Sequence, residues 1–206
     1  MDLTDQELRV LGCLVEKAAT TPDTYPLTLN ALITACNQRS NREPVVDYDD
    51  ATVIRAIDGL RDRGWIRITH TPGQRAVKYK HVLGDMLDLD DRTLALLAVL
   101  MLRGDQTPGE LRTRTGRYVE FSSLGEVDDV LLGLLQRDLA ARLDRRPGEK
   151  ENRYRHLLGG APAPEPVVHT TEAPDDGLAE RVAALEAEVA RLSSELAALL
   201  AALGEE

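Results

Sequence analysis

The chain has 206 residues, of which 43% are apolar and only 3% aromatic, so one or two small domains with aliphatic cores are expected. No apolar run reaches the roughly 18 residues of a membrane-spanning helix, and the acidic start lacks the basic region of a signal peptide, so a cytoplasmic protein is expected. Of the net charge of −10, residues 161–206 contribute 2 basic and 10 acidic side chains, which leaves the rest nearly neutral and compatible with nucleic-acid binding.

Three helices are predicted before residue 65, because apolar side chains recur there at intervals of three and four. The first begins near Asp5, behind a capping box formed by Thr4 and Glu7. The third follows a cap at Asp49 and ends at Gly64. The second, between them, contains Leu29, Leu32, Ile33 and Cys36.

The pattern then changes and predicts two short strands, residues 65–68 and 76–79, joined by a turn at 71–74. Pro72 followed by Gly73 suits the centre of a type II turn, since the second position needs a positive φ. Three helices followed by a hairpin are the order of a winged helix, a helix-turn-helix with an added wing.

The same order recurs in the second half of the chain. Helices are predicted near residues 94–101, 107–115 and 127–135, with capping boxes at Thr107–Glu110 and Ser123–Glu126. The hairpin that follows aligns with the first at an offset of 75 residues without a gap, so that Pro147-Gly148 matches Pro72-Gly73. We therefore expect a mainly α fold with small β-hairpins (α+β), built as two tandem winged-helix domains over residues 1–85 and 86–159.

Residues 160–176 are rich in Pro, Ala and Thr and are expected to form an extended linker. In residues 177–203, Leu and Val alternate at steps of four and three, which is the seam of a coiled coil. Val at a with Leu at d favours two parallel strands, so a homodimer is expected; the alternative is a helix that packs on its own domain. The expected dimerisation residues are Leu178, Val182, Leu185, Val189, Leu192, Leu196, Leu199 and Leu203.

Several stretches carry a resemblance to a known family: Leu8–Gly12, Thr20–Asn30, Ala35–Arg42, Leu102–Arg112 and the hairpin with Pro147-Gly148 and Arg153-Tyr154. Over about residues 3–159 the chain resembles the YceH-like family, uncharacterised bacterial proteins with tandem winged helices. Arg39 and Asp105 depart from the pattern, since Lys and Pro are usual there. The resemblance implies the fold and no particular activity, because that family has no established biochemical function.

The sequence contains no P-loop, dinucleotide-binding glycine pattern, zinc-spaced Cys/His set or nucleophile elbow. Cys13 and Cys36 fall on apolar helix faces and are expected to be inert buried thiols. A non-enzymatic binding protein without cofactor or metal is therefore expected.

Arginine, lysine and asparagine side chains in the hairpins and at helix ends suit contacts with nucleic-acid phosphates. The candidates are Asn37, Arg39, Asn41 and Arg42 in a turn expected to be exposed to solvent, Arg75, Lys78 and Lys80 in the first hairpin, Arg112, Arg114 and Arg117 around the second helix of the second half, and Arg145, Arg146, Lys150 and Arg153 in the second hairpin. Such charges are equally compatible with solvated or internally paired surface residues.

The third helices would enter the major groove of DNA, and their acidic residues count against DNA binding. The first begins Asp47-Tyr48-Asp49-Asp50, and the second carries Asp128 and Asp129. Several carboxylates together repel the phosphate backbone. Two functions therefore stay open: a DNA-binding or transcription-regulatory protein, and an adaptor that docks other proteins through its winged helices.

Overall fold

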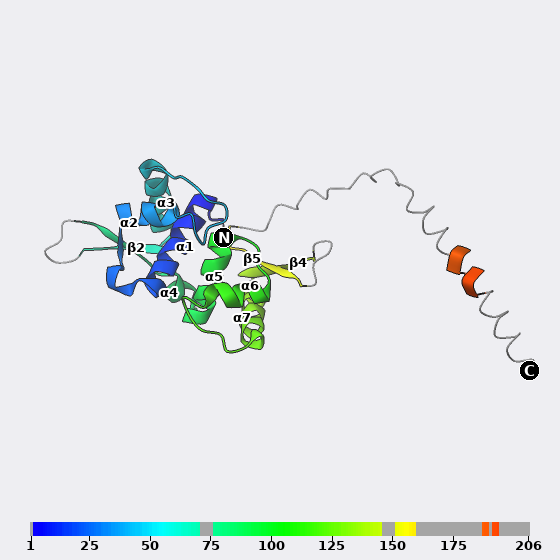
Figure 1. The fold of residues 1–206 in the computed structure, drawn as a ribbon. Coiled ribbons are helices and arrows are strands. Elements are labelled where there is room, and N and C mark those ends of the chain that lie inside the picture. Colours follow the sequence, from blue (N-terminus) through cyan, green and yellow to red (C-terminus); the bar gives the residue numbers. More distant parts are fainter. Residues whose placement is uncertain (1, 71–75, 146–150, 160–186, 190, 194–206) are drawn as a thin grey trace, which may run out of the picture. The chain divides into compact units, whose positions relative to one another are not determined.

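The computed structural model describes residues 2–70, 76–145, 151–159, 187–189 and 191–193. The chain divides into two units, Met1–Pro162 and Ala163–Glu206. The first unit is mixed in secondary structure, with helices around two small antiparallel sheets (Figure 1). The expected content of helices and small β-hairpins is confirmed.

The first half of this unit contains α1 (Asp5–Thr20), η1 (Pro22–Thr24), β1 (Leu27–Thr28), α2 (Leu29–Cys36), α3 (Asp50–Asp62), β2 (Ile66–Thr69), β3 (Lys78–His81) and α4 (Leu83–Leu87). The predicted caps are present: Thr4 forms its capping box with Glu7, and Asp49 accepts from the backbone N–H of Thr52. Gly64 ends the α3 region with a φ of 77°, a conformation that glycine adopts without strain. Three short elements, η1, β1 and α4, were not predicted.

The second half contains α5 (Asp91–Arg103), α6 (Pro108–Thr115), α7 (Leu124–Gln136), β4 (Ala140–Leu143) and β5 (Arg153–His156). Thr107 forms the predicted capping box with Glu110. At α7 the prediction holds only in part: Ser123 caps the helix, but the Glu126 carboxylate accepts from the N–H of Ser122.

The strand pairs of the two halves correspond, although β5 lies 75 residues after β3 and β4 only 74 residues after β2, so the second hairpin is one residue longer than the first. Ile66 lies opposite His81 and Ile68 opposite Tyr79, while Ala140 lies opposite His156 and Arg142 opposite Tyr154. The first hairpin was predicted slightly too early in the sequence. Trp65 is not in β2 because its N–H bonds the Leu60 carbonyl at the end of α3.

A third strand position is also repeated. Leu27 in β1 pairs with Tyr79 and directly precedes Thr28, which caps α2. Gln106 forms an isolated bridge with Tyr154 and directly precedes Thr107, which caps α6. The repeat seen in the sequence is therefore a repeat of backbone pairing as well.

The two halves share one core, in which the first helix of each, α1 and α5, packs against the other (Figure 1). Gly12 allows the close approach, because a Cβ atom there would lie 2.9 Å from Leu102 Cγ. The Leu3 N–H also bonds the Leu158 carbonyl and ties the chain start to the end of the second hairpin. The expected boundary after residue 85 falls inside α4.

In the second unit, residues 187–189 and 191–193 are helical, and Arg191 pairs with Glu188. Of the expected dimerisation residues, Val189 and Leu192 are described, and both are exposed in the single chain. Leu178, Val182, Leu185, Leu196, Leu199 and Leu203 lie outside the described residues, as does the linker beyond residue 159.

Candidate nucleic-acid interface

The first hairpin presents three cations on one face. Residues directly opposite in an antiparallel pair point to the same side of the sheet. Arg67 in β2 lies opposite Lys80 in β3, and Lys78 lies opposite Thr69 on one side and Thr28 of β1 on the other. Arg67, Lys78 and Lys80 therefore share a face, which we call the β2–β3 cationic face.

Within the described part of the chain, the side chains of Arg67, Lys78 and Lys80 make no hydrogen bond or ion pair. Arg67 and Lys80 are like charges directly opposite each other, an arrangement that is destabilising in a sheet. An anion seated on this face would remove that repulsion.

The second hairpin carries cations at the same positions, but there they are neutralised. Arg155, which matches Lys80, donates from Nε and Nη2 to the two carboxylate oxygens of Asp105, at 2.6 Å each. Arg153, which matches Lys78, donates from Nη1 to Glu110 Oε2 at 2.8 Å and to the Asp105 carbonyl at 3.1 Å. The second hairpin lacks the like-charge pair, because Arg155 faces Ala141.

The difference between the hairpins comes from two positions next to the helix caps. Asp105 lies two residues before the capping Thr107, and Glu110 lies three residues after it. Around the equivalent cap, Thr28, the same positions hold Pro26 and Ala31. The first half therefore lacks the two carboxylates that hold the cations of the second.

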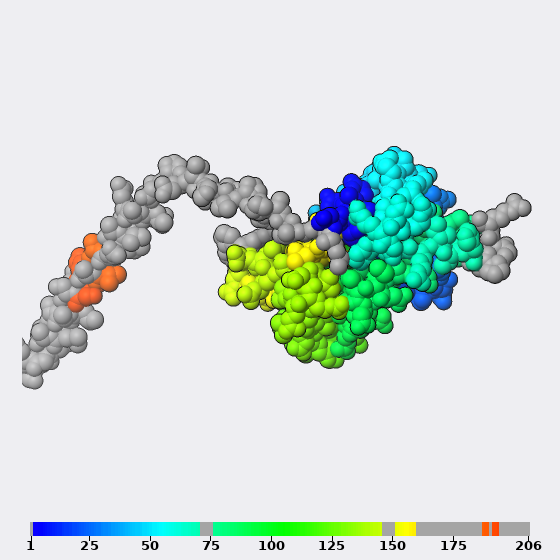
Figure 2. Space-filling model, turned by 180° about the vertical axis from the view of Figure 1, so that it is seen from behind, coloured from blue at the N-terminus to red at the C-terminus, as the bar shows by residue number. Residues whose placement is uncertain are grey.

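The two hairpins also project from opposite ends of the first unit (Figure 1), and the view from behind in Figure 2 agrees. They do not form one continuous surface. On the first hairpin, Arg67 joins the predicted Lys78 and Lys80 on one face. Arg67 was missed by the sequence reasoning, although pairing across the Pro72-Gly73 turn would have placed it on the face of Lys78 and Lys80, opposite Lys78; in the structure it lies opposite Lys80.

The turn expected to be exposed, Asn37 to Arg42, is partly buried, and this corrects the expectation for Arg42. The Arg42 side chain has no exposed surface; it forms an ion pair with Glu16 at 2.5 Å and donates twice to the Ala35 carbonyl. The run of polar residues from Asn37 to Arg42 suggested an exposed turn, because the partner that buries Arg42, Glu16, lies 26 residues away in the sequence, on α1.

The two asparagines of this turn have structural partners. The Asn37 side chain bonds both the N–H and the carbonyl of Tyr48. Asn41 has a φ of 58°, and its Oδ1 accepts from Arg103 Nη1 at 2.8 Å. Arg39 is exposed, as predicted.

Glu16 and Arg42 form the centre of a polar cluster inside the first unit. The Tyr118 hydroxyl donates to Glu16 Oε1 at 3.3 Å, and Arg117 approaches the same oxygen at 3.5 Å. Burial opposes ionisation of Glu16, but the hydrogen bond and charge of Arg42 outweigh it and hold the pKa below its usual value. Glu16 lies on α1 in the first half, and Tyr118 lies after α6 in the second half. The cluster therefore links the two halves.

The thiols belong to the same region. Cys13 and Cys36 are both buried, as predicted, and Arg42 Nη2 lies 3.4 Å from Cys13 Sγ.

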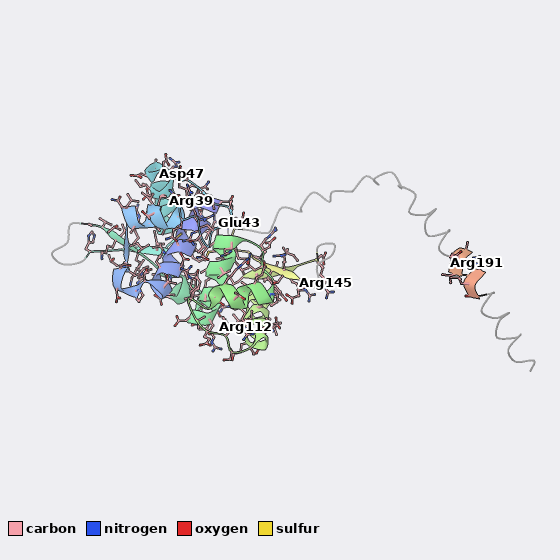
Figure 3. The ribbon with its side chains drawn as sticks, in the orientation of Figure 1. Arg39, Glu43, Asp47, Arg112, Arg145 and Arg191 are labelled. Atoms are coloured by element: carbon pink, nitrogen blue, oxygen red, sulfur yellow. The ribbon has the colours of Figure 1, made fainter. Side chains whose placement is uncertain are left out.

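The remaining predicted cations are dispersed. Arg112 donates to the carbonyls of Phe121 and Ser122, and Arg114 pairs with Glu110. Arg145 bonds the Asn152 side chain. Figure 3 shows Arg39, Arg112 and Arg145 well apart from one another. Arg75, Arg146 and Lys150 lie outside the described residues.

The third helices differ between the halves. The α7 helix contains no Lys or Arg, and its exposed residues include Asp128, Asp129 and Leu132. In contrast, α3 carries Arg55 and Arg61, both exposed. The third helix of the half with the unpaired hairpin cations therefore carries two arginines, although it also holds three aspartates and Arg61 pairs with Asp58.

Comparison with known proteins places the chain in a family. A family model described as a protein of unknown function, DUF480, matches residues 3–149. The chain belongs to the DUF480 family. This confirms membership in an uncharacterised bacterial family.

Curated relatives of this DUF480 protein carry the name UPF0502 protein, which states no activity. One from Geobacter metallireducens is 50% identical over 196 residues, covering 94% of this chain and 88% of the relative. One from Pectobacterium atrosepticum is 46% identical over 209 residues, covering 97% and 98%. One from Opitutus terrae is 49% identical over 174 residues, covering 80% and 76%.

Among the described residues, no helix has the length and apolar character needed to cross a membrane.

Proposed function

We propose that this DUF480 protein is a non-enzymatic nucleic-acid-binding protein with two tandem winged helices, which contacts the phosphate backbone of duplex DNA through its first half. The β2–β3 hairpin is then the first wing and β4–β5 the second. The observation that carries the proposal is the β2–β3 cationic face: Arg67, Lys78 and Lys80 lie together and have no partner within the described residues.

The internal repeat supports this proposal. At corresponding strand positions, the cations of the two hairpins are treated differently. The second half neutralises Arg153 and Arg155 with Glu110 and Asp105, and the first half holds Ala31 and Pro26 at those positions. The cations that stay unpaired gain most from a phosphate, because they have no ion pair to give up.

Backbone contact suits the surrounding chemistry better than base reading. The three cations and the Thr28 hydroxyl on the same face can all donate to phosphate oxygens, whereas the Thr69 hydroxyl already donates to the Lys78 carbonyl. The only third helix with cations, α3, also exposes Asp50 and Asp62. We therefore propose binding of low sequence selectivity, with Arg75 and Arg39 as further candidates for contact.

The experiment is fluorescence anisotropy of the full chain with a short mixed-sequence duplex over a salt series. Each neutralised phosphate contributes about 0.9 to the slope of log K against log salt, so three contacts predict a slope of about −3. Absence of binding at low salt, where electrostatic attraction is strongest, would contradict the proposal. Binding with a slope near zero would contradict the role of the cationic face.

An adaptor function is the second candidate, and one observation favours it. The α7 surface is acidic and carries Leu132 and Leu124 at 53% and 38% exposure, which suits a protein partner better than DNA. Replacing Leu132 with Ser should remove such a partner in a binding assay. Ile54→Ser on α3, where Ile54 is 41% exposed, is the matched control.

We also propose that the protein is a homodimer through a coiled coil over residues 177–203. Two of the seam residues, Val189 and Leu192, are exposed in the single chain, as a helix that needs a partner requires. A dimer would double the number of cationic faces and so increase avidity for a long duplex.

A further inference from the structure

A cavity of about 340 Å³ lies where the two halves of the first unit meet. Its walls come from four segments: the end of α1, the end of β3, the beginning of α5 and the loop after α6. Cavities of roughly 300–1,000 Å³ at such junctions are the usual sites for small organic ligands.

Small side chains create the space. Ala18 and Ala19 on α1 and Ala95 on α5 line the cavity, where larger residues would fill it. Val15, Leu94 and Val119 complete an apolar interior. The body of an occupant must therefore be apolar and compact.

The polar groups that line the cavity determine whether a positively or a negatively charged ligand is favoured. The Asp91 carboxylate is exposed and lines the cavity. Burial favours the neutral form of His81 by lowering its pKa below the usual value, and it outweighs the charge of Asp85, which raises the pKa. The Tyr118 hydroxyl already donates to Glu16. Among the lining side chains the only formal charge is therefore negative, although Lys80 lies near enough to affect His81.

We propose that this cavity binds a small amphipathic cation, with a ring or branched apolar body among the alanines and an amine directed to Asp91. The site is distinct from the β2–β3 cationic face. The two are joined through β3, because His81 ends the strand that carries Lys78 and Lys80. The inference does not depend on DNA binding, and its test contains no DNA.

The test uses two probes of similar shape and opposite charge, tryptamine and indole-3-propionate, titrated into isotope-labelled full chain and followed by two-dimensional NMR. We expect tryptamine to shift the amide resonances of Ala18, Leu94 and Val119 and to bind more tightly than the carboxylate. Failure of both probes to shift these resonances at millimolar concentration would overturn the proposal. Tighter binding of the carboxylate would overturn the assigned charge.

Two variants locate the site. Ala19 is exposed, so Ala19→Phe can fill the cavity without entering the core, and it should weaken tryptamine binding about tenfold or more. Ala51→Phe, at an exposed position on α3, should leave binding unchanged. Equal loss in both variants, or no loss in Ala19→Phe, would place the probe elsewhere and overturn the proposal.

A charge variant tests the contact with the amine. Asp91→Asn should weaken tryptamine binding about two- to fivefold, as expected for an exposed ion pair, and should not weaken binding of the carboxylate. Asp62→Asn, an exposed carboxylate on α3 that does not line the cavity, is the control. Unchanged tryptamine affinity in Asp91→Asn would contradict the assigned contact.

Discussion

Arg155 donates to both carboxylate oxygens of Asp105 at 2.6 Å each, and this pair joins β5 to the loop before α6. At the matching positions of the first half, Lys80 and Pro26 form no such pair. This difference gives Arg153 and Arg155 a structural role in the second hairpin, and the proposed binding role of the first hairpin rests on it.

The structural role predicts a loss of stability without a loss of binding. Replacing both Arg153 and Arg155 with Gln should lower the free energy of unfolding by about 1–2 kcal/mol, because two partly exposed charge-assisted contacts disappear. Urea denaturation measures this change. A variant with unchanged stability would show that these ion pairs do not hold the second hairpin.

The buried pair of Glu16 and Arg42 predicts a larger effect. Replacing Glu16 with Leu leaves an uncompensated buried guanidinium and should cost about 3–5 kcal/mol, whereas the double replacement Glu16→Leu, Arg42→Met should cost less than the sum of Glu16→Leu and Arg42→Met made singly. The comparison is a double-mutant cycle by urea denaturation. Additive losses would contradict coupling between the two side chains.

Stability should fall in mildly acidic solution because of His156. Burial lowers the pKa of His156 to about 4, against 6.5 for the free side chain, so the unfolded chain takes up the proton more readily. The contribution of neutral His156 to the free energy of unfolding is therefore complete above about pH 6.5 and decreases as the pH falls towards 4. Buried His81 acts in the same direction.

Thermal melting across this pH range tests the assignment. His156→Asn should reduce the pH dependence of the melting temperature, and the exposed His70→Asn should leave it as in the unmodified chain. An identical pH dependence in His156→Asn and the unmodified chain would mean that other groups cause it.

The coiled coil predicts a change of oligomeric state. A chain that lacks residues 163–206 keeps the whole first unit and its core, and should be a folded monomer by light scattering, whereas the full chain should be a dimer. A truncated chain that is still a dimer would place the interface on the first unit.

The helices and the repeat could be predicted from the sequence because their signals are local. Thr4, Asp49 and Thr107 cap helices where the sequence indicates caps. The offset of 75 residues holds between β3 and β5, whereas β4 lies only 74 residues after β2, so the gapless alignment was wrong by one residue in the first strand. The two-residue strand β1 and the one-turn helix α4 have no such signal, since each depends on a partner distant in the sequence.

The site could be predicted only in part, since pairing between distant residues decides which cations are available. Lys78 and Lys80 were predicted as candidates and stay unpaired among the described residues. Arg42 and Arg153 were predicted on the same grounds, but Glu16 and Glu110 reach them across the fold. The sequence places these carboxylates 26 and 43 residues away, too far for periodicity or composition to connect them.

The most direct test of the account compares the two hairpins in one assay. Duplex DNA binding is measured by anisotropy over a salt series for two double variants. The first combines Lys78→Gln with Lys80→Gln, and the second combines Arg153→Gln with Arg155→Gln. The account predicts that the first double variant loses affinity and about 1.8 from the magnitude of the salt slope, while the second keeps both. Equal affinity in the two variants, or a loss confined to the second, would contradict it.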